Sequence, residues 1–254
     1  MQASDGNFYG TTYTTIYRMT PSGTLTTVYR FCQQLSCQDG DPGGLSIGPD
    51  GALYGATLYG TIFKMTLDGT FQVLDQICST SGGCGLIYSP PIPASDGNLY
   101  GTIGSGSRYP RGAIYRITTS GALKVLYAFC SAPDCRDGTN PHGPRFQATD
   151  GNLYGTTLGE DGPSVVWRLS MGLPPFVSPL PAYGQPRRQI SILGTNLTGA
   201  TAVTFNGTPA GAFEVNQTGS AITTRVPDGA TTGLIEVTLA DGTILSSNIP
   251  FQVR

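Results

Sequence analysis

Charged residues and histidine are scarce in this sequence. Only 12% of the 254 residues are Asp, Glu, Lys or Arg, and the formal net charge is −2. Nucleic-acid-binding proteins carry a basic excess, so this function class is excluded. His142 is the single histidine, and a Ser-His-Asp triad, a Cys-His pair or a multi-His metal site would each have to use it. We therefore expect no metal site and no cofactor.

The sequence also lacks an apolar run of about 18 residues, which a membrane-spanning helix requires. Nor does it begin with the basic start and apolar stretch of a secretory signal. We expect that a signal was removed, or that the sequence starts at a mature or truncated end. Glycine and proline, in contrast, are abundant, with 36 and 19 residues. With frequent Thr and Tyr, this composition predicts an all-β protein with many tight turns.

The motif Asp-Gly-x-x-Tyr-Gly occurs four times along the chain. Its copies are Asp5–Gly10, Asp50–Gly55, Asp96–Gly101 and Asp150–Gly155. A second motif follows each copy and consists of a β-branched residue, an aromatic residue, a cation and an aliphatic residue or methionine. Its copies are Ile16–Met19, Ile62–Met65, Ile114–Ile117 and Val166–Leu169. Recurrence of both motifs at an interval of about 45 residues indicates internal repeats.

Each repeat is predicted to contain about four strands. Short β-branched and aromatic stretches bounded by Gly, Asp, Asn or Pro are typical of strands. Asp-Gly-Asn is a hairpin-turn signal, because Gly and Asn tolerate the positive φ of tight turns. A third apolar stretch follows the second motif at residues 24–31, 70–74 and 122–129. A four-stranded repeat of this length has the size of a β-propeller blade.

These motifs resemble the tandem repeat called GloVer. The resemblance rests on Asp-Gly-Asn-Leu-Tyr-Gly-Thr-Thr, then Ile-Tyr-Arg-Ile-Thr, a Gly, and Val-Leu-Tyr-x-Phe, and it covers roughly residues 1–170. The family occurs in secreted or surface bacterial proteins, often with C-terminal sorting signals, and implies a propeller-like extracellular domain. It supplies no established activity or catalytic residues, so none is transferred here. The sequence departs from the family pattern because no anchor follows the repeats.

The repeat domain is predicted over residues 1–172, with units at about 1–37, 43–84, 85–135 and 143–170. We expect a small or partial β-propeller of about four blades. Its first unit has almost nothing before Asp5, so that unit's first strand is cut short. The fourth strand of the last unit would fall at Leu173–Pro179, which three prolines disfavour as an inner strand. Open ends expose strand edges, and we expect a second copy of the chain, or residues before Met1, to cover them.

The repeat motifs and the cysteines end before about Pro175. Several prolines form a stiff connection, and alternating segments with turns every 8–12 residues then predict a small β-sandwich over residues 173–254. This part is similar to the IPT/TIG immunoglobulin-like domain, on the residues Gly194–Leu197, Val203–Gly207 and Val226–Gly233. In bacterial surface proteins such domains commonly act as spacers or interaction modules. DNA binding is not expected here, because the module is not basic.

The six cysteines form three close pairs. They are Cys32/Cys37, Cys78/Cys84 and Cys130/Cys135. Local disulfides are the simplest interpretation, and they would imply an oxidising, extracellular compartment. Each would close a small ring and contribute about 2 kcal/mol, so it would pin a loop rather than hold the core. A thiolate metal site is the alternative, although no pair has a nearby histidine or further cysteine.

The repeated cations are the first candidate binding groups. They are Arg18, Lys64, Arg116 and Arg168, and the turn residues Asp5, Asp50, Asp96 and Asp150 match them in number. In a radial arrangement the cations could form a positive arc that holds an acidic sugar or carboxylate. In the alternative, each Asp orders its turn and each cation pairs locally. The repeated Tyr9, Tyr54, Tyr100 and Tyr154 are predicted to pack between blades.

Variable loops on a rigid scaffold commonly carry binding residues. The candidates in the loops between second and third strands are Tyr13, Tyr59, Arg108, Tyr109 and Arg111, with Glu160 and Asp161 in the last repeat. Their rings could stack on sugars, or they could be ordinary loop residues. His142 is a further candidate, in a turn that parallels Asp39–Pro42.

Two further kinds of site are weaker candidates. The carboxylates of Asp39, Asp41 and Asp137 could bind Ca²⁺, but their spacing is not that of an EF-hand. Three N-x-Thr sequons, at Asn196, Asn206 and Asn216, mark potential glycosylation sites.

Three functions remain open from the sequence. The leading hypothesis is an extracellular or cell-surface structural or adhesive protein that self-associates into an oligomer or filament through exposed repeat edges. The second is a carbohydrate-binding module that uses the loop Tyr and Arg residues, with a polysaccharide as partner. The third, which rests on fold analogy alone, is a glycoside hydrolase or polysaccharide lyase. Its acid/base groups would have to come from Glu160, Asp161 and His142.

Overall fold

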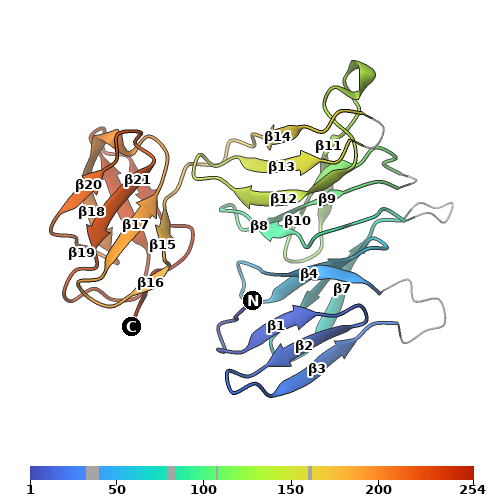
Figure 1. The fold of residues 1–254 in the computed structure, drawn as a ribbon, viewed down its shortest axis with the longest axis horizontal. Coiled ribbons are helices and arrows are strands. Elements are labelled where there is room, and N and C mark those ends of the chain that lie inside the picture. The colour runs from blue at the N-terminus through green and yellow to red at the C-terminus, as the bar shows by residue number, and fades with distance from the viewer. Residues whose placement is uncertain (33–39, 79–83, 107, 160–161) are drawn as a thin grey trace. The chain divides into compact units, whose positions relative to one another are not determined.

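The computed structural model describes residues 1–32, 40–78, 84–106, 108–159 and 162–254. The chain forms two compact units (Figure 1). The repeat domain comprises Met1–Gln147 and Leu153–Leu169, and the C-terminal domain comprises Ala148–Asn152 and Ser170–Arg254. The described residues form strands and two short 3₁₀ helices, η1 (Pro133–Cys135) and η2 (Leu197–Gly199). The all-β prediction is therefore confirmed. Within the described ranges, no helix has the length and apolar character needed to cross a membrane.

Four antiparallel sheets follow one another along the repeat domain (Figure 1). The first contains β1 (Phe8–Thr11), β2 (Thr15–Met19) and β3 (Leu25–Arg30). The second contains β4 (Pro42–Ile47), β5 (Leu53–Thr57), β6 (Thr61–Met65) and β7 (Phe71–Gln76). The third contains β8 (Ile92–Pro93), β9 (Leu99–Ile103), β10 (Ala113–Ile117) and β11 (Leu123–Ala128). The fourth contains β12 (Pro141–Gln147), β13 (Leu153–Thr157) and β14 (Val166–Leu169).

The two outer sheets each have one strand fewer than the two inner sheets. Among the described residues, the first sheet has only an isolated bridge between Gln2 and Phe8 at the position of β4 and β8, and the fourth has no counterpart of β7 and β11. The segment after Leu169, where the sequence disfavours a strand, leaves the repeat domain and enters the C-terminal domain. Because proline cannot donate a hydrogen bond to a neighbouring strand, the fourth sheet ends at β14.

Successive repeat sheets pack against each other in chain order. β1 contacts β4, β4 contacts β8, and β9 contacts β12. The cores lie between neighbouring sheets. One buried cluster joins Tyr9 and Ile16 of the first sheet to Phe63 of the second. The next joins Tyr54 and Ile62 of the second sheet to Tyr115 and other residues of the third. The second sheet therefore contributes to two cores, one on each face.

The Asp-Gly turn of the first motif has the same backbone conformation in every repeat. Its glycines Gly6, Gly51, Gly97 and Gly151 have φ values of 81°, 77°, 77° and 84°. This left-handed region disfavours residues with a Cβ, which explains why glycine stands at this position. The Asp carboxylate accepts the backbone N–H two residues later, as Asp96 does from Asn98 at 3.1 Å. The side chain thereby closes the turn that the sequence predicts.

The glycine that ends the first motif has a different role. It lies directly across from the aromatic residue of the second motif, in the pairs Gly10/Tyr17, Gly55/Phe63, Gly101/Tyr115 and Gly155/Trp167. In each pair the ring covers the glycine so closely that a Cβ on the glycine would collide with it. The ring fills the space that a side chain would otherwise take, which fixes the register between the two central strands.

The C-terminal domain is a β-sandwich. One sheet contains β15 (Ser178–Leu180), β17 (Gln189–Leu193), β21 (Ala221–Arg225) and β20 (Phe213–Val215) in that order. The other contains β19 (Thr208–Pro209), β18 (Ala200–Phe205), β22 (Ile235–Leu239) and β23 (Ile244–Ser246). β16 (Tyr183–Gly184) pairs in parallel with β24 (Gln252–Val253). The core includes Ile192, Phe205, Ile222, Val237 and Phe251. This architecture agrees with the predicted immunoglobulin-like module.

Candidate functional site

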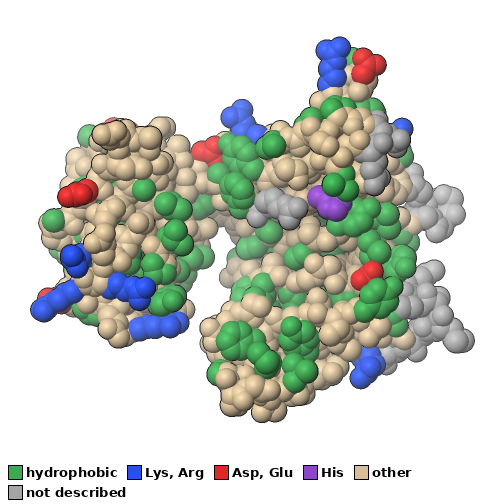
Figure 2. All heavy atoms as spheres, in the orientation of Figure 1, with side chains coloured by type: hydrophobic (Ala, Val, Ile, Leu, Met, Phe, Trp, Pro, Cys, Tyr) green, Lys and Arg blue, Asp and Glu red, His purple; other side chains and the backbone are tan. Residues whose placement is uncertain are grey.

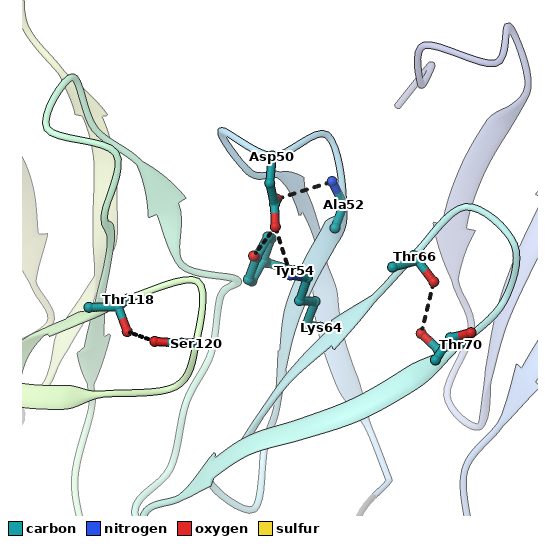
Figure 3. A network of polar contacts seen from close by, with 8 residues as sticks. All are labelled: Asp50, Ala52, Tyr54, Lys64, Thr66, Thr70, Thr118 and Ser120. Atoms are coloured by element: carbon teal, nitrogen blue, oxygen red, sulfur yellow. Dashed lines mark hydrogen bonds and ion pairs between the residues drawn. The ribbon is translucent and has the colours of Figure 1, made fainter.

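The repeated Asp, Tyr and cation form a local cluster in the second repeat (Figure 3). Asp50 accepts hydrogen bonds from the Tyr54 hydroxyl at 2.9 Å and from the Ala52 amide at 3.2 Å, and it forms an ion pair with Lys64 at 2.7 Å. Burial alone would raise the pKa of Asp50, but the hydrogen bonds from Lys64 and Tyr54 outweigh it and hold the pKa below its ordinary value. Here the cation is engaged with its own turn.

The first and third repeats contain the same tyrosine–aspartate contact. Tyr9 donates to Asp5 at 2.9 Å, and Tyr100 donates to Asp96 at 2.7 Å. Burial, and then the hydrogen bond to Asp96, raise the pKa of Tyr100. These tyrosines are almost fully buried, so each one anchors its turn to the core between two sheets. The local interpretation therefore accounts for the aspartates and tyrosines of the first three repeats and for the cation Lys64 of the second.

The predicted loop residues lie on separate repeats. Tyr13 and Tyr59 are exposed on the β1–β2 and β5–β6 loops. Arg108 and Tyr109 lie on the β9–β10 loop, where the Arg108 guanidinium is 5.6 Å from the Tyr109 ring centre. These two line a groove of about 360 Å³ with Asp75 and Gln76. Of the five loop candidates, this pair is the one that combines a cation, a ring and a groove.

Among the remaining predicted catalytic and metal groups, the structure describes His142, Asp41 and Asp137. His142 stacks on Tyr88 with ring centres 4.3 Å apart, and the Arg111 carbonyl accepts the Asn140 amide at 2.9 Å. Asp41 lies in a left-handed turn conformation. Glu160, Asp161 and Asp39 lie outside the described residues. Within the part of the chain that the structure describes, no group of three or more His, Cys, Asp or Glu side chains could hold a metal.

Two of the predicted disulfides are present, Cys78–Cys84 and Cys130–Cys135. The pair Cys32/Cys37 lies outside the described residues, because Cys37 is not among them. The Cys130–Cys135 loop is also held by Asp137, which accepts the Tyr127 hydroxyl at 2.6 Å and the Ser131 amide at 3.0 Å. Asp137 therefore orders this loop. These half-buried disulfides are consistent with an extracellular location.

The three sequon asparagines lie in turns of the C-terminal domain. Asn196 has a left-handed φ of 58° just before η2. The side-chain amide of Asn206 donates to Thr231 at 2.9 Å, and that of Asn216 donates to Ser220 at 3.0 Å. Each asparagine thus contributes to local turn structure, and glycosylation stays a prediction.

Apolar side chains are exposed on both the first and the fourth sheet of the repeat domain. Ile16, Ile62 and Ile114, at the same position of the second motif, face the following sheet and are 0%, 0% and 2% exposed. Val166 is their counterpart in the fourth repeat, and it is 78% exposed. Phe146, on β12 of the same sheet, is also exposed and stacks on Tyr154 of β13 with ring centres 5.9 Å apart. We call Phe146, Tyr154 and Val166 the back face.

The first sheet carries the complementary surface. Leu53, Phe63 and Met65 of the second sheet face the first sheet and are fully buried. Their counterparts in the first sheet are Phe8, Tyr17 and Met19, and these are only partly buried. Leu25, the counterpart of Phe71, is 64% exposed. We call Phe8, Tyr17, Met19 and Leu25 the front face. The front face and the back face are the two halves of an inter-sheet contact that the chain makes internally between its sheets.

The missing outer strand of the fourth sheet leaves a groove beside the back face. In the second repeat, Phe71 on the outer strand stacks on Tyr29 of the first sheet with ring centres 3.7 Å apart. The equivalent space between the third and fourth sheets is a groove of about 460 Å³. Tyr127, Phe129 and Trp167 line it. The fourth sheet is therefore incomplete both at its edge and on its face.

Comparison with family models gives two matches. Residues 1–167 match the Gloeobacter/Verrucomicrobia repeat model. Residues 175–253 match the IPT/TIG domain model. Both resemblances inferred from the sequence motifs are confirmed. A search of curated proteins found no match.

The solved structures that match the chain share little sequence with it. A Thermus thermophilus structure described as a putative oxidoreductase (glucose dehydrogenase) is 16% identical, with a TM-score of 0.41, and the match covers 94% of this chain and 89% of that one. The protein SGBP-B of a mixed-linkage glucan utilization locus of Bacteroides ovatus, solved with a heptasaccharide, is 13% identical, with a TM-score of 0.29. That match covers 100% of this chain and 54% of SGBP-B. At these values the similarities assign no function.

Proposed function

The chain belongs to the Gloeobacter/Verrucomicrobia repeat family, and we propose that it is an extracellular structural protein that self-associates head to tail. In this proposal the front face of one copy packs on the back face of another. The observation that carries the proposal is the exposure of Val166, 78% against 0–2% for its three counterparts. The equivalent side chains are buried in every other repeat. Covering Val166 with a further sheet would remove its apolar surface from water, which stabilises the assembly.

The chain itself supplies the template for this contact. Within it, the second sheet covers Ile16 of the first, and the third sheet covers Ile62 of the second. A second copy's first sheet would cover Val166 with the apolar residues of β1, β2 and β3, and it has only an isolated Gln2–Phe8 bridge at the position of β4. Its Leu25 and Tyr17 have no preceding sheet among the described residues. Each copy would then bury two surfaces, one at each end of its repeat domain.

Such a contact is heterologous, because it joins different surfaces of the two copies. A heterologous contact repeats from copy to copy, and it produces a ring if the rotation closes and a filament if it does not. The open ends therefore favour assembly beyond a dimer. The C-terminal domains would be carried along the assembly at regular intervals.

Val166→Lys is expected to abolish this association. Burying a valine contributes about 1.5–3 kcal/mol, and a charge in its place would have to be desolvated. We expect affinity between copies to fall by at least about tenfold. Light scattering at matched concentrations should give assemblies for the original chain and 26.6 kDa for the variant. Ile244→Lys is the matched control, because Ile244 is 58% exposed on β23 of the C-terminal domain.

A mixing experiment separates head-to-tail contact from other modes. Leu25→Lys blocks the front face and leaves the back face intact, and Val166→Lys does the reverse. Each variant alone should be monomeric, and an equimolar mixture should form one-to-one dimers that grow no further. A monomeric original chain at all concentrations, or association that persists in the Val166→Lys variant, would refute the proposal.

Carbohydrate binding at the Arg108–Tyr109 groove is a second candidate function. An aromatic ring beside a cation, with Asp75 and Gln76 in the same groove, offers stacking and hydrogen bonding to a sugar. Tyr109→Ala should then abolish glycan binding on a broad panel, whereas Tyr13→Ala should leave it unchanged. Absence of binding to every glycan on the panel would reject this candidate.

A further inference from the structure

The cations of the C-terminal domain gather at one end of it. Between residues 170 and 254 the chain has four cations, all of them arginine: Arg187, Arg188, Arg225 and Arg254. All four are exposed. Figure 2 shows Lys and Arg side chains concentrated at one end of this domain, beside the chain end labelled C in Figure 1. The domain has no excess of positive charge. The arginines therefore form a cluster because the fold brings them together, and not because the domain is basic.

Strand pairing brings these residues together from distant parts of the sequence. Arg187 and Arg188 directly precede β17, and Gln189 at its start pairs with Arg225 at the end of β21. Arg225 also donates to the Arg187 carbonyl at 3.0 Å. The parallel pair β16/β24 places Tyr183 opposite Gln252, which brings the end of the chain to the same place.

The arginines line a groove and contact an aromatic ring. The first is an open groove of about 640 Å³, lined by Arg187, Arg225, Gln189, Glu214 and Thr223 among others. The second is the Tyr183 ring, with the Arg254 guanidinium 4.3 Å and the Arg188 guanidinium 5.7 Å from its centre. Both features adjoin the start of β17. A ligand that lies across this end of the domain would contact both.

Most of this positive charge is not neutralised within the domain. Arg187 forms an ion pair with Asp228, at 2.9 Å. Among the described residues, no carboxylate forms an ion pair with Arg188, Arg225 or Arg254. The planar guanidinium group is well suited to bind a carboxylate through two hydrogen bonds. Three arginines are thus available for an anionic partner.

We propose that this end of the C-terminal domain binds a carboxylated polysaccharide. The arginines would hold carboxylates, and Gln189, Thr223 and Glu214 would exchange hydrogen bonds with sugar hydroxyls. The Tyr183 ring holds the Arg188 and Arg254 guanidinium groups in place through cation–π contacts. Because the arginines are spread over several strands rather than directed at one point, they match an extended ligand with charges at intervals.

The acidic residues in the groove distinguish this partner from a nucleic acid. A nucleic-acid duplex carries one charge per about 1.7 Å of its axis. Glu214 and Asp228 in the groove lining would repel such a dense row of phosphates. In a polysaccharide with one carboxylate per sugar, neutral hydroxyl groups lie between the charges, and these can donate to the two carboxylates. The mixed lining therefore favours the polysaccharide.

Affinity electrophoresis of the full chain tests the proposal, with alginate as the acidic probe and dextran as the neutral one. We expect alginate and not dextran to retard the chain, and added salt to weaken the effect. Arg188→Gln with Arg225→Gln should weaken alginate binding by about tenfold or more. Lys124→Gln with Arg136→Gln is the control, because it removes the same charge from exposed positions of the repeat domain. It should change binding less than about twofold.

Several outcomes would overturn the proposal. Equal losses in the two double variants would mean that only net charge matters. Equal retardation by dextran would mean that carboxylates are not recognised. Tighter binding to a double-stranded DNA fragment than to alginate would identify phosphate as the preferred anion. Circular dichroism of the variants separates lost binding from lost folding, and Arg188→Lys with Arg225→Lys keeps the charge but loses the paired hydrogen bonds. That variant should bind more weakly than the original chain.

Discussion

Tyr54→Ala is expected to destabilise the repeat domain by about 3–5 kcal/mol, the usual cost of truncating a buried aromatic residue. Tyr54 is fully buried in the core between the second and third sheets. Its hydroxyl also donates to Asp50 at 2.9 Å, next to the Lys64 ion pair. The truncation therefore creates a cavity and removes one donor from the turn. Urea unfolding followed by fluorescence measures the effect, because Trp167 is the single tryptophan and lies in the repeat domain.

Tyr54→Phe separates the two contributions. It keeps the ring and removes only the hydrogen bond to Asp50, so we expect a loss of about 0.5–1.5 kcal/mol. Tyr13→Ala serves as the surface control, because Tyr13 is 67% exposed, and it should change stability by less than about 0.5 kcal/mol. If Tyr54→Phe were as costly as Tyr54→Ala, the hydrogen bond rather than packing would hold the repeat together.

The repeat architecture is readable from the sequence because its signals are local. Asp-Gly turns, β-branched and aromatic stretches, and prolines after Leu169 each act over a few residues. They predict the strands, the four sheets and the strand that is missing after β14. Of the four tyrosines predicted to pack between blades, Tyr9, Tyr54 and Tyr100 are buried. Tyr154, in the last repeat, is only half-buried.

The candidate surfaces depend on tertiary structure and are not readable in this way. Val166 and Ile62 are equally apolar in the sequence, and only the presence or absence of a following sheet makes one exposed and the other buried. The arginine cluster joins Arg188 to Arg225 through strand pairing across a long separation in sequence. The sequence nominates Tyr13, Tyr59, Arg108 and Tyr109 alike as loop residues, and only the structure places Arg108 and Tyr109 at a groove.

Gly101→Val is the second large effect that we expect, with a loss of about 3 kcal/mol or more, at the upper end of the range for overpacked cores. Gly101 lies across from Tyr115, and a Cβ on Gly101 would collide with the Tyr115 ring. Tyr115 is fully buried in the core between the second and third sheets. The ring therefore has no free space to enter, and the two central strands of the third sheet would have to separate. The same Trp167 fluorescence measures the loss.

Two further variants identify the Tyr115 ring as the cause. Gly211→Val should be nearly neutral, because no atom lies within 4 Å of a Cβ at Gly211. Tyr115→Ala is destabilising by itself, but in the Gly101→Val background it removes the collision. The double variant should therefore lose less stability than the sum of the two single variants, with a coupling of at least about 1 kcal/mol. Additive losses would mean that Gly101 is required for its backbone conformation. The cross-strand contact of the Tyr-Gly motif would then not set the register of the repeat.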